Sequence, residues 1–185
     1  MATRDAEATK TRILAAAVEE FAAHGLAGGR VDRIAKAASS NVRMIYAYFG
    51  DKSGLFDAAL VTALRKLASD APPRPYDLPG WAGDVFDHHR QHPDVLRLSM
   101  WAQLERPSAT AAPLETYADK VDLIRPTAPA PFSPVDVLVI VYAVAQAWFL
   151  SPIGLTGLEG DADGEERLAA HRASVVAAVE RMLHT

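Results

Sequence analysis

The sequence predicts an all-α fold, and two observations support that class. Half of the 185 residues are apolar, which is enough to form a proper core. The apolar residues recur at the three- and four-residue spacing of a helix face, and no long stretch shows the two-residue alternation of a strand. The chain has no cysteine, so neither disulfides nor thiolate metal sites hold the fold.

The first predicted helix runs from about residue 9 to residue 24. Gly25 follows it, and a glycine at this place is typical of a helix end. The helix carries one apolar stripe, which we assign to the core: Ile13, Leu14, Ala17, Val18 and Phe21.

Two short helices joined by a tight turn are predicted in residues 31–49. In the first, Ile34, Ala35 and their neighbours form a small apolar face, which lets a second helix cross close by. Ser39 and Ser40 interrupt the pattern with hydroxyls that can cap a helix. The pattern then resumes in residues 41–49. This arrangement predicts a helix-turn-helix.

The outward face of residues 41–49 has side chains that suit a DNA major groove. Asn41 can bond adenine, Arg43 can fork onto guanine, and Val42 can touch a thymine methyl. The alternative is an ordinary solvated helix in a small α-domain.

The rest of the chain predicts a series of helices broken by proline. A long helix, residues 53–69, is a candidate link between two domains, because a shift of one end must move the other. Proline-rich connections stand at residues 71–79 and 125–134. The remaining helices are expected at residues 81–92, 93–105, 114–124, 135–150 and 164–183.

Residues 135–150 form the most apolar segment. The segment holds Asp136 and Gln146, and Pro152 stops it short of the roughly 20 residues that a membrane span needs. We therefore interpret it as a helix buried on all faces. The chain has too few other helices to cover it, so we expect a second copy to pack against it and the last helix in a twofold dimer.

Residues 11–60 resemble the DNA-binding domain of the TetR family of transcriptional regulators. The resemblance is carried by the segments RILAAAVEEFAAHG, VDRIAKAASSN and IYAYFGDKSGLFDAAL. It implies a three-helix helix-turn-helix DNA-binding domain in residues 1–52 and a helical effector-binding and dimerisation domain in residues 53–185. The chain departs from the family at Ser39, where glycine is frequent, at Ser40, where an apolar residue is frequent, and at Arg30, where threonine is frequent.

The resemblance also implies phosphate-binding roles for Lys52 and for the tyrosines near it. For Tyr48 the alternative is simple packing beside Phe49. With the groove-facing residues, the predicted DNA contacts are Arg30, Asn41, Val42, Arg43, Tyr46, Ala47, Tyr48 and Lys52.

A homodimer would place two recognition helices over a palindromic operator, and phosphate contacts would supply most of the affinity. The predicted interface lies on the last two long helices and consists of Val137, Ile140, Val141, Val144, Trp148, Leu168, His171, Arg172, Val175 and Val179.

The family resemblance implies a small apolar or amphipathic effector that releases a repressor from DNA by favouring a conformation unsuited to the operator. The predicted pocket combines apolar and polar side chains: Trp81, Phe86, His89, Met100, Trp101, Gln103, Tyr117, Tyr142 and Trp148. Side chains of these types are more often core than ligand contacts.

Other functions have less support. An architectural DNA-binding protein without an effector is one alternative. A metal-dependent enzyme is another, because His88 and His92 have the i, i+4 spacing of metal ligands, although only Asp84 shares their face. A solvated polar face explains the same spacing. We predict no catalytic residue, no cofactor, no metal and no enzyme activity, since nucleophile motifs, phosphate loops and paired carboxylates are absent.

Charge and the N-terminal sequence complete the expectations. The net charge is −4, but residues 1–52 hold 8 Lys and Arg against 6 Asp and Glu, which places the positive end at the predicted DNA-binding domain. The polar N-terminal sequence predicts no signal peptide and a cytoplasmic protein.

Overall fold

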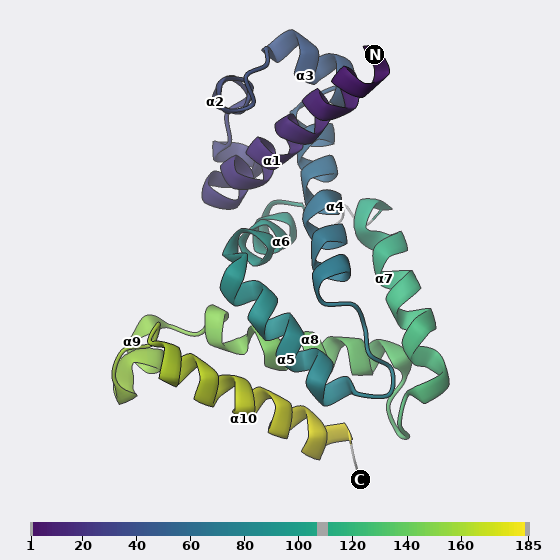
Figure 1. Cartoon of the computed structure of the whole chain (residues 1–185), viewed down its shortest axis with the longest axis vertical. Coiled ribbons are helices and arrows are strands. Elements are labelled where there is room, and N and C mark those ends of the chain that lie inside the picture. Colours follow the sequence, from purple (N-terminus) through teal and green to yellow (C-terminus); the bar gives the residue numbers. More distant parts are fainter. Residues whose placement is uncertain (1, 107–110, 184–185) are drawn as a thin grey trace. The chain divides into compact units, whose positions relative to one another are not determined.

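The computed structural model describes residues 2–106 and 111–183, and every regular element in these ranges is helical. The predicted all-α class is therefore confirmed. In chain order the elements are α1 (Ala2–Gly28), α2 (Val31–Ala37), α3 (Val42–Phe49), α4 (Lys52–Asp70), α5 (Leu78–Gln91), α6 (Pro93–Glu105), α7 (Ala111–Ile124), the 3₁₀ turn η1 (Arg125–Thr127), α8 (Pro134–Leu150), α9 (Ile153–Thr156), the 3₁₀ turn η2 (Gly157–Glu159) and α10 (Glu165–Leu183) (Figure 1).

The chain forms two compact units. The first unit comprises Met1–Lys66 with Pro93–Thr116, and the second comprises Leu67–His92 with Tyr117–Thr185. The predicted boundary after residue 52 separates DNA binding from effector binding and dimerisation. This division by function stays a prediction.

The core of the first unit is built where α1, α2, α3, α4 and α6 bring their apolar faces together. Phe21 of α1 and Phe56 of α4 meet edge to face, with ring centroids 5.1 Å apart. The other large side chains that are almost fully buried in this unit are Ile13, Ile34, Ile45, Leu55 and Leu98.

In α1 the helical backbone is interrupted at Gly25, which has φ +69° and lets the segment up to Gly28 continue at a kink. A Cβ at residue 25 would lie 2.8 Å from a ring carbon of Trp101 on α6. Glycine is therefore required here both by the positive φ and by the close approach of the indole.

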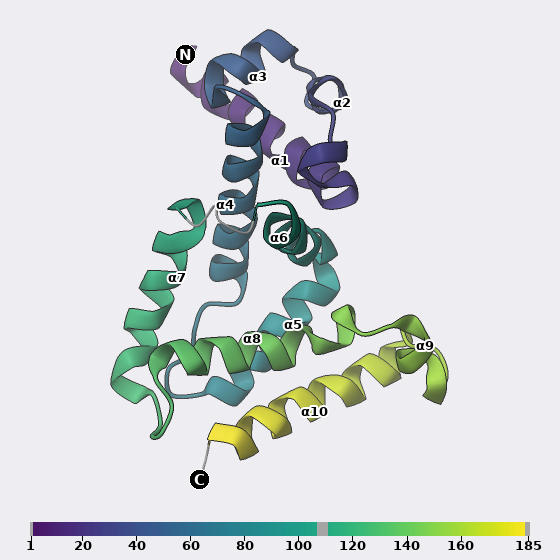
Figure 2. The ribbon, with the colours of Figure 1, turned by 180° about the vertical axis from the view of Figure 1, so that it is seen from behind.

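The second unit is a bundle in which α5 packs against α8 and α10, and α8 runs beside α10 (Figure 2). Phe86 of α5 stacks on Phe149 of α8 with centroids 5.1 Å apart. The indole of Trp81 is fully buried and donates to the carbonyl of Ala71 at 3.0 Å.

Helix α8 is not buried on all faces within the described chain. Ser133 and Asp136 form a capping box at its N-terminus. Val137 and Val141 are buried, whereas Val139 is 60% exposed. Among the described residues no single helix is long and apolar enough to span a membrane, although the bent pair Pro134–Leu150 and Ile153–Glu159 meets those criteria when taken together.

Candidate nucleic-acid interface and buried polar cluster

The turn between α2 and α3 is fixed by local hydrogen bonds. The amides of Ala38 and Ser40 donate to the carbonyls of Ile34 and Ala35, both at 2.9 Å. Ser39 adopts φ +49°, the left-handed conformation that glycine would take without strain. The serine that stands in place of the family's frequent glycine thus adopts a conformation that favours glycine.

The N-cap of α3 is Asn41, whose side-chain oxygen accepts from the amide of Met44 at 2.8 Å. The expectation that Ser39 or Ser40 would cap this helix is wrong, because the turn leaves Asn41 as the last extended residue before it. The Asn41 amide group still has donors to offer to a partner.

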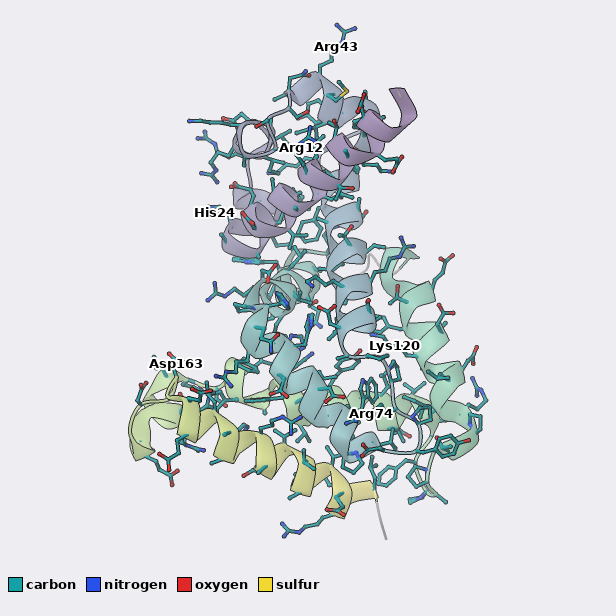
Figure 3. The ribbon with its side chains drawn as sticks, viewed as in Figure 1. Arg12, His24, Arg43, Arg74, Lys120 and Asp163 are labelled. Carbon is teal, nitrogen blue, oxygen red and sulfur yellow. The ribbon has the colours of Figure 1, made fainter. Side chains whose placement is uncertain are left out.

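Helix α3 is held to the first unit by one face. Ile45 is fully buried, while Arg43, Tyr46 and Ala47 on the other faces are exposed. The side chain of Arg43 extends away from α1 and α2 (Figure 3). Helix α3 thus presents a free surface with a cation at its outer side.

The predicted phosphate contacts differ in their surroundings. Arg30 is exposed and is the N-cap residue of α2, with its backbone amide donating to Glu20. The ammonium of Lys52 donates to the carbonyl of Ala27 at 3.1 Å, so it partly neutralises the end of α1. Tyr48 is half-buried, and its ring meets that of Phe49 at 6.1 Å.

Two arginines near this surface have structural partners. Arg33 binds Glu20, and although burial raises the pKa of Glu20, hydrogen bonds from Arg33 and from the Arg30 amide outweigh burial and hold that pKa below its usual value. Arg12 donates from Nε to the carbonyl of Ala38 at 3.3 Å and thereby ties α1 to the turn.

In the second unit, part of the predicted pocket surrounds a buried lysine that the sequence interpretation missed. Lys120 of α7 is 4% exposed, and its ammonium donates to the Tyr142 hydroxyl of α8 at 2.6 Å. The same nitrogen lies 5.8 Å from the centre of the Tyr117 ring. Burial lowers the pKa of Lys120 to about 8 and raises the pKa of Tyr117. We call Lys120, Tyr117, Tyr142, His89 and Gln146 the buried polar cluster.

His89 joins this cluster through Gln146, whose amide nitrogen lies 3.2 Å from Nε2 of His89. Burial lowers the pKa of His89 to about 4, with help from His88 and the charge of Lys120, so the ring is neutral near pH 7. Its Nδ1 is buried and has no hydrogen-bond partner among the described residues. The ring of Trp81 lies 6.0 Å from that of Tyr142.

The other predicted pocket residues lie elsewhere. Trp101 belongs to the first unit, where its indole donates to the carbonyl of Ala22 at 3.2 Å, and Met100 and Gln103 are exposed on the same helix. Phe86 is fully buried between Phe149 and His171.

Trp148 lines a separate cavity of about 350 Å³ between α8 and α10. The guanidinium of Arg167 lies 4.4 Å from the centre of the Trp148 ring, and the ring of His171 lies at the same distance. The remaining lining residues come from α8, α9 and η2 and from the residue that follows α8: Ala147, Ser151, Leu155, Thr156, Leu158 and Glu159.

One signal for Lys120 exists in the sequence. Tyr117, Lys120 and Ile124 follow one another at helical spacing, and Ile124 is fully buried. A lysine in the middle of such a stripe is more informative than a lysine on a polar face.

The sequence matches two family models. Residues 13–59 match the model described as bacterial regulatory proteins, tetR family, and residues 77–181 match the tetracyclin repressor-like C-terminal domain. Together the two models include α2 and α3 as well as the buried polar cluster.

Comparison with individual proteins also indicates helix-turn-helix transcriptional regulators. The HTH-type transcriptional repressor SCO4008 of Streptomyces coelicolor is 46% identical over 129 residues, which cover 68% of this chain and 67% of the relative. NicS of Pseudomonas putida, also an HTH-type transcriptional repressor, is 34% identical over 102 residues, 51% of this chain and 48% of NicS. The crystal structure of SCO4942 from Streptomyces coelicolor, described as a transcriptional regulator, superposes with a TM-score of 0.79 at 37% identity, covering 95% of this chain and 98% of that one.

Proposed function

Because the chain belongs to the TetR family of helix-turn-helix transcriptional regulators, we propose that it is a repressor that binds a palindromic operator as a homodimer and leaves it when a small molecule binds. The family consists of regulators and not of enzymes. The observation that carries the proposal is the exposed face of α3 opposite the buried Ile45.

In the proposed complex, α3 enters the major groove. Arg43 is the residue suited to a guanine edge, because its guanidinium is exposed and can donate two parallel hydrogen bonds. Val42, Tyr46, Ala47 and the free amide of Asn41 complete the reading surface. Arg30, Lys52 and Tyr48 then bind phosphates at its border.

The proposed dimer forms through the exposed faces of α8 and α10. Exposed apolar side chains on α8 include Val139 and Leu150, and water is excluded from them only by a partner. Of the predicted contact residues, Ile140, Val144, Trp148, His171 and Arg172 remain partly exposed. The others are buried within the protomer and support that face from behind: Val137, Val141, Leu168, Val175 and Val179.

We place the effector at the buried polar cluster and infer that it is a small aromatic anion. Lys120 forms no ion pair with any carboxylate that the structure describes, and a buried cation without a counter-charge is costly. An aromatic carboxylate would supply that charge, accept from Nδ1 of His89 and lie against Trp81 and Tyr142. Such a ligand is amphipathic, in agreement with the sequence-based expectation.

Selection of bound sequences from a random duplex pool tests the DNA-binding part. We expect enrichment of one palindrome with two half-sites about one helical turn apart or a multiple of that. Enrichment of no sequence would contradict a specific operator and would favour an architectural DNA-binding protein.

Release from the selected duplex tests the effector part. Benzoate, salicylate and indole acetate are compared with benzamide, which has a similar ring and no charge. We expect release by at least one carboxylate and not by the amide, and we expect Lys120→Met to abolish the response. Release that is equal for acid and amide would contradict an anion site.

A further inference from the structure

A group of three metal-ligand side chains lies in the second unit, apart from the buried polar cluster. His88 and His92 stand one turn apart at the end of α5, and Asp70 is the last residue of α4. The carboxylate oxygen Oδ2 of Asp70 lies 3.4 Å from Nδ1 of His88 and 3.8 Å from Nε2 of His92. All three ligand atoms lie within 4.8 Å of one another.

The third member of this group is Asp70 and not Asp84, which shares the helix face with the two histidines in the sequence. Asp84 shares the helix face, but its carboxylate is bound by Arg74 at 3.2 Å and by Arg172 at 3.6 Å. Asp70 takes its place because the connection between α4 and α5 returns the chain, so that the end of one helix meets the end of the other.

Two of the three ligand separations are close to those around a tetrahedral ion. Zinc binds imidazole nitrogen and carboxylate oxygen at about 2.0–2.2 Å, so two of its ligands in a tetrahedron lie about 3.3–3.6 Å apart. The pair Asp70 and His88 has this separation, and the pair Asp70 and His92 exceeds it by a few tenths of an ångström. A side-chain rotation of His92 closes that difference, since this ring is only partly buried.

The donor set selects the class of metal. Two imidazoles and one carboxylate suit zinc and its first-row neighbours, whereas calcium and magnesium prefer oxygen ligands alone. Three protein ligands leave a fourth position for water or a further ligand.

Burial distinguishes this group from an ordinary surface ion pair. His88 is 4% exposed, which excludes the solvated polar face that its spacing alone allowed. The side chains of His92 and Asp70 are 35% and 37% exposed, so an ion has access from one side. A buried ring with two accessible ligands is the arrangement expected of a site that an ion enters and leaves.

We propose that Asp70, His88 and His92 form a binding site for a divalent transition-metal ion, with zinc as the best-fitting ion. The site joins the end of α4 to the end of α5, and its existence does not depend on operator binding or on the aromatic effector.

Titration of the tag-free, EDTA-treated full chain tests the proposal. Zinc is followed by calorimetry, and cobalt is followed by its visible absorption, whose intensity distinguishes four-coordinate from six-coordinate ions. We expect one ion per chain, a four-coordinate cobalt spectrum and a higher melting temperature with zinc.

The variants avoid His88, whose replacement in the core could unfold the protein. His92→Asn and Asp70→Asn each remove a partly exposed ligand. We expect each to weaken zinc binding by at least about tenfold, because mutation of a residue that only hydrogen-bonds to a metal ligand already costs about that much. The matched controls His24→Asn and Asp119→Asn change exposed residues outside the group and should bind zinc as the parent does.

Two results would overturn the proposal. One is an unaltered melting temperature and no binding signal with zinc in the parent chain. The other is binding that His92→Asn and Asp70→Asn retain in full, because the ion would then lie at another place.

Discussion

The carboxylate of Glu105, at the end of α6, accepts a hydrogen bond from the backbone amide of Leu26 at 2.5 Å. The same carboxylate also accepts from Ala27 at 3.2 Å, directly after the kink at Gly25. The ammonium of Lys52 donates to the carbonyl of Ala27. A single peptide segment after the kink is thus held by α6 and by the first residue of α4, both within the first unit.

Replacement of Glu105 by glutamine should destabilise this unit. The substitution keeps the size of the side chain but replaces the charged acceptor by a neutral amide oxygen, which weakens the bonds from Leu26 and Ala27, and we expect a loss of about 1–2 kcal/mol in the free energy of unfolding. Urea denaturation measures the loss. The exposed Glu115→Gln serves as control, and equal stability of the two variants would show that the contact contributes nothing.

Arg43→Ala and Lys52→Ala should affect DNA binding in different ways. Loss of Arg43 removes a base contact and should relax sequence preference at one position of each half-site, at a cost of about 1–3 kcal/mol. Loss of Lys52 should weaken all duplexes alike and reduce the salt slope by about one. Fluorescence anisotropy over a salt series measures both effects. The distant, exposed Arg181→Ala is the control.

An unchanged sequence preference of Arg43→Ala would argue against direct reading of a base by this residue. The melting temperature of Lys52→Ala must be recorded as well, because the substitution also removes the hydrogen bond to Ala27.

Val139→Asp should dissociate the proposed dimer. It puts a charge on the exposed apolar face of α8 without touching the core of the protomer, so the monomer should keep its helical content. Sedimentation velocity gives the molecular mass. Tyr76→Asp changes another exposed side chain of the second unit and should leave the dimer intact. A Val139→Asp protein that sediments like the parent would exclude this face as the interface.

The stability of the protein should depend on the charge of Lys120. The folded pKa of about 8 lies below the value of an unfolded lysine, so the folded state binds this proton more weakly than the unfolded chain does. The cost of burying the charge is therefore present in full below pH 8 and is relieved as the pH rises from about 8 towards 10.4.

Lys120→Met removes that cost and should be more stable than the parent at pH 7 by about 1–2 kcal/mol, since part of the gain is lost with the hydrogen bond to Tyr142. The difference should shrink at pH 10, as followed by urea denaturation at both pH values. A difference that does not change with pH would mean that the buried amine keeps an ordinary pKa.

The helix-turn-helix could be predicted from the sequence because it depends on the spacing of apolar residues that are close together in the chain. The distances between Ile34, Ile45 and Phe49 along the chain decide which faces are buried, and the boundaries of α2 and α3 agree with the prediction to within a residue. The N-cap was missed because three polar residues in a row could all cap a helix, and only the backbone conformation of the turn selects Asn41.

The buried polar cluster and the group of Asp70, His88 and His92 were harder to predict from the sequence, since each depends on contacts between segments distant in sequence. Asp70 reaches His88 only through the return of the chain between α4 and α5. Lys120 meets Tyr142 across two helices, and lysine is usually a surface residue. Trp101 was among the pocket candidates because it is an aromatic residue of the middle helices. The structure places it on α6, where its indole contacts α1.

Binding of the selected palindrome by the parent chain tests the central claim most directly. The affinity is measured beside that for a shuffled duplex of the same composition, at several salt concentrations. We predict two chains per duplex and a preference for the palindrome of at least about a thousandfold, the lower end for specific regulators. Equal affinity for both duplexes at every salt concentration would contradict the assignment of α3 as a recognition helix.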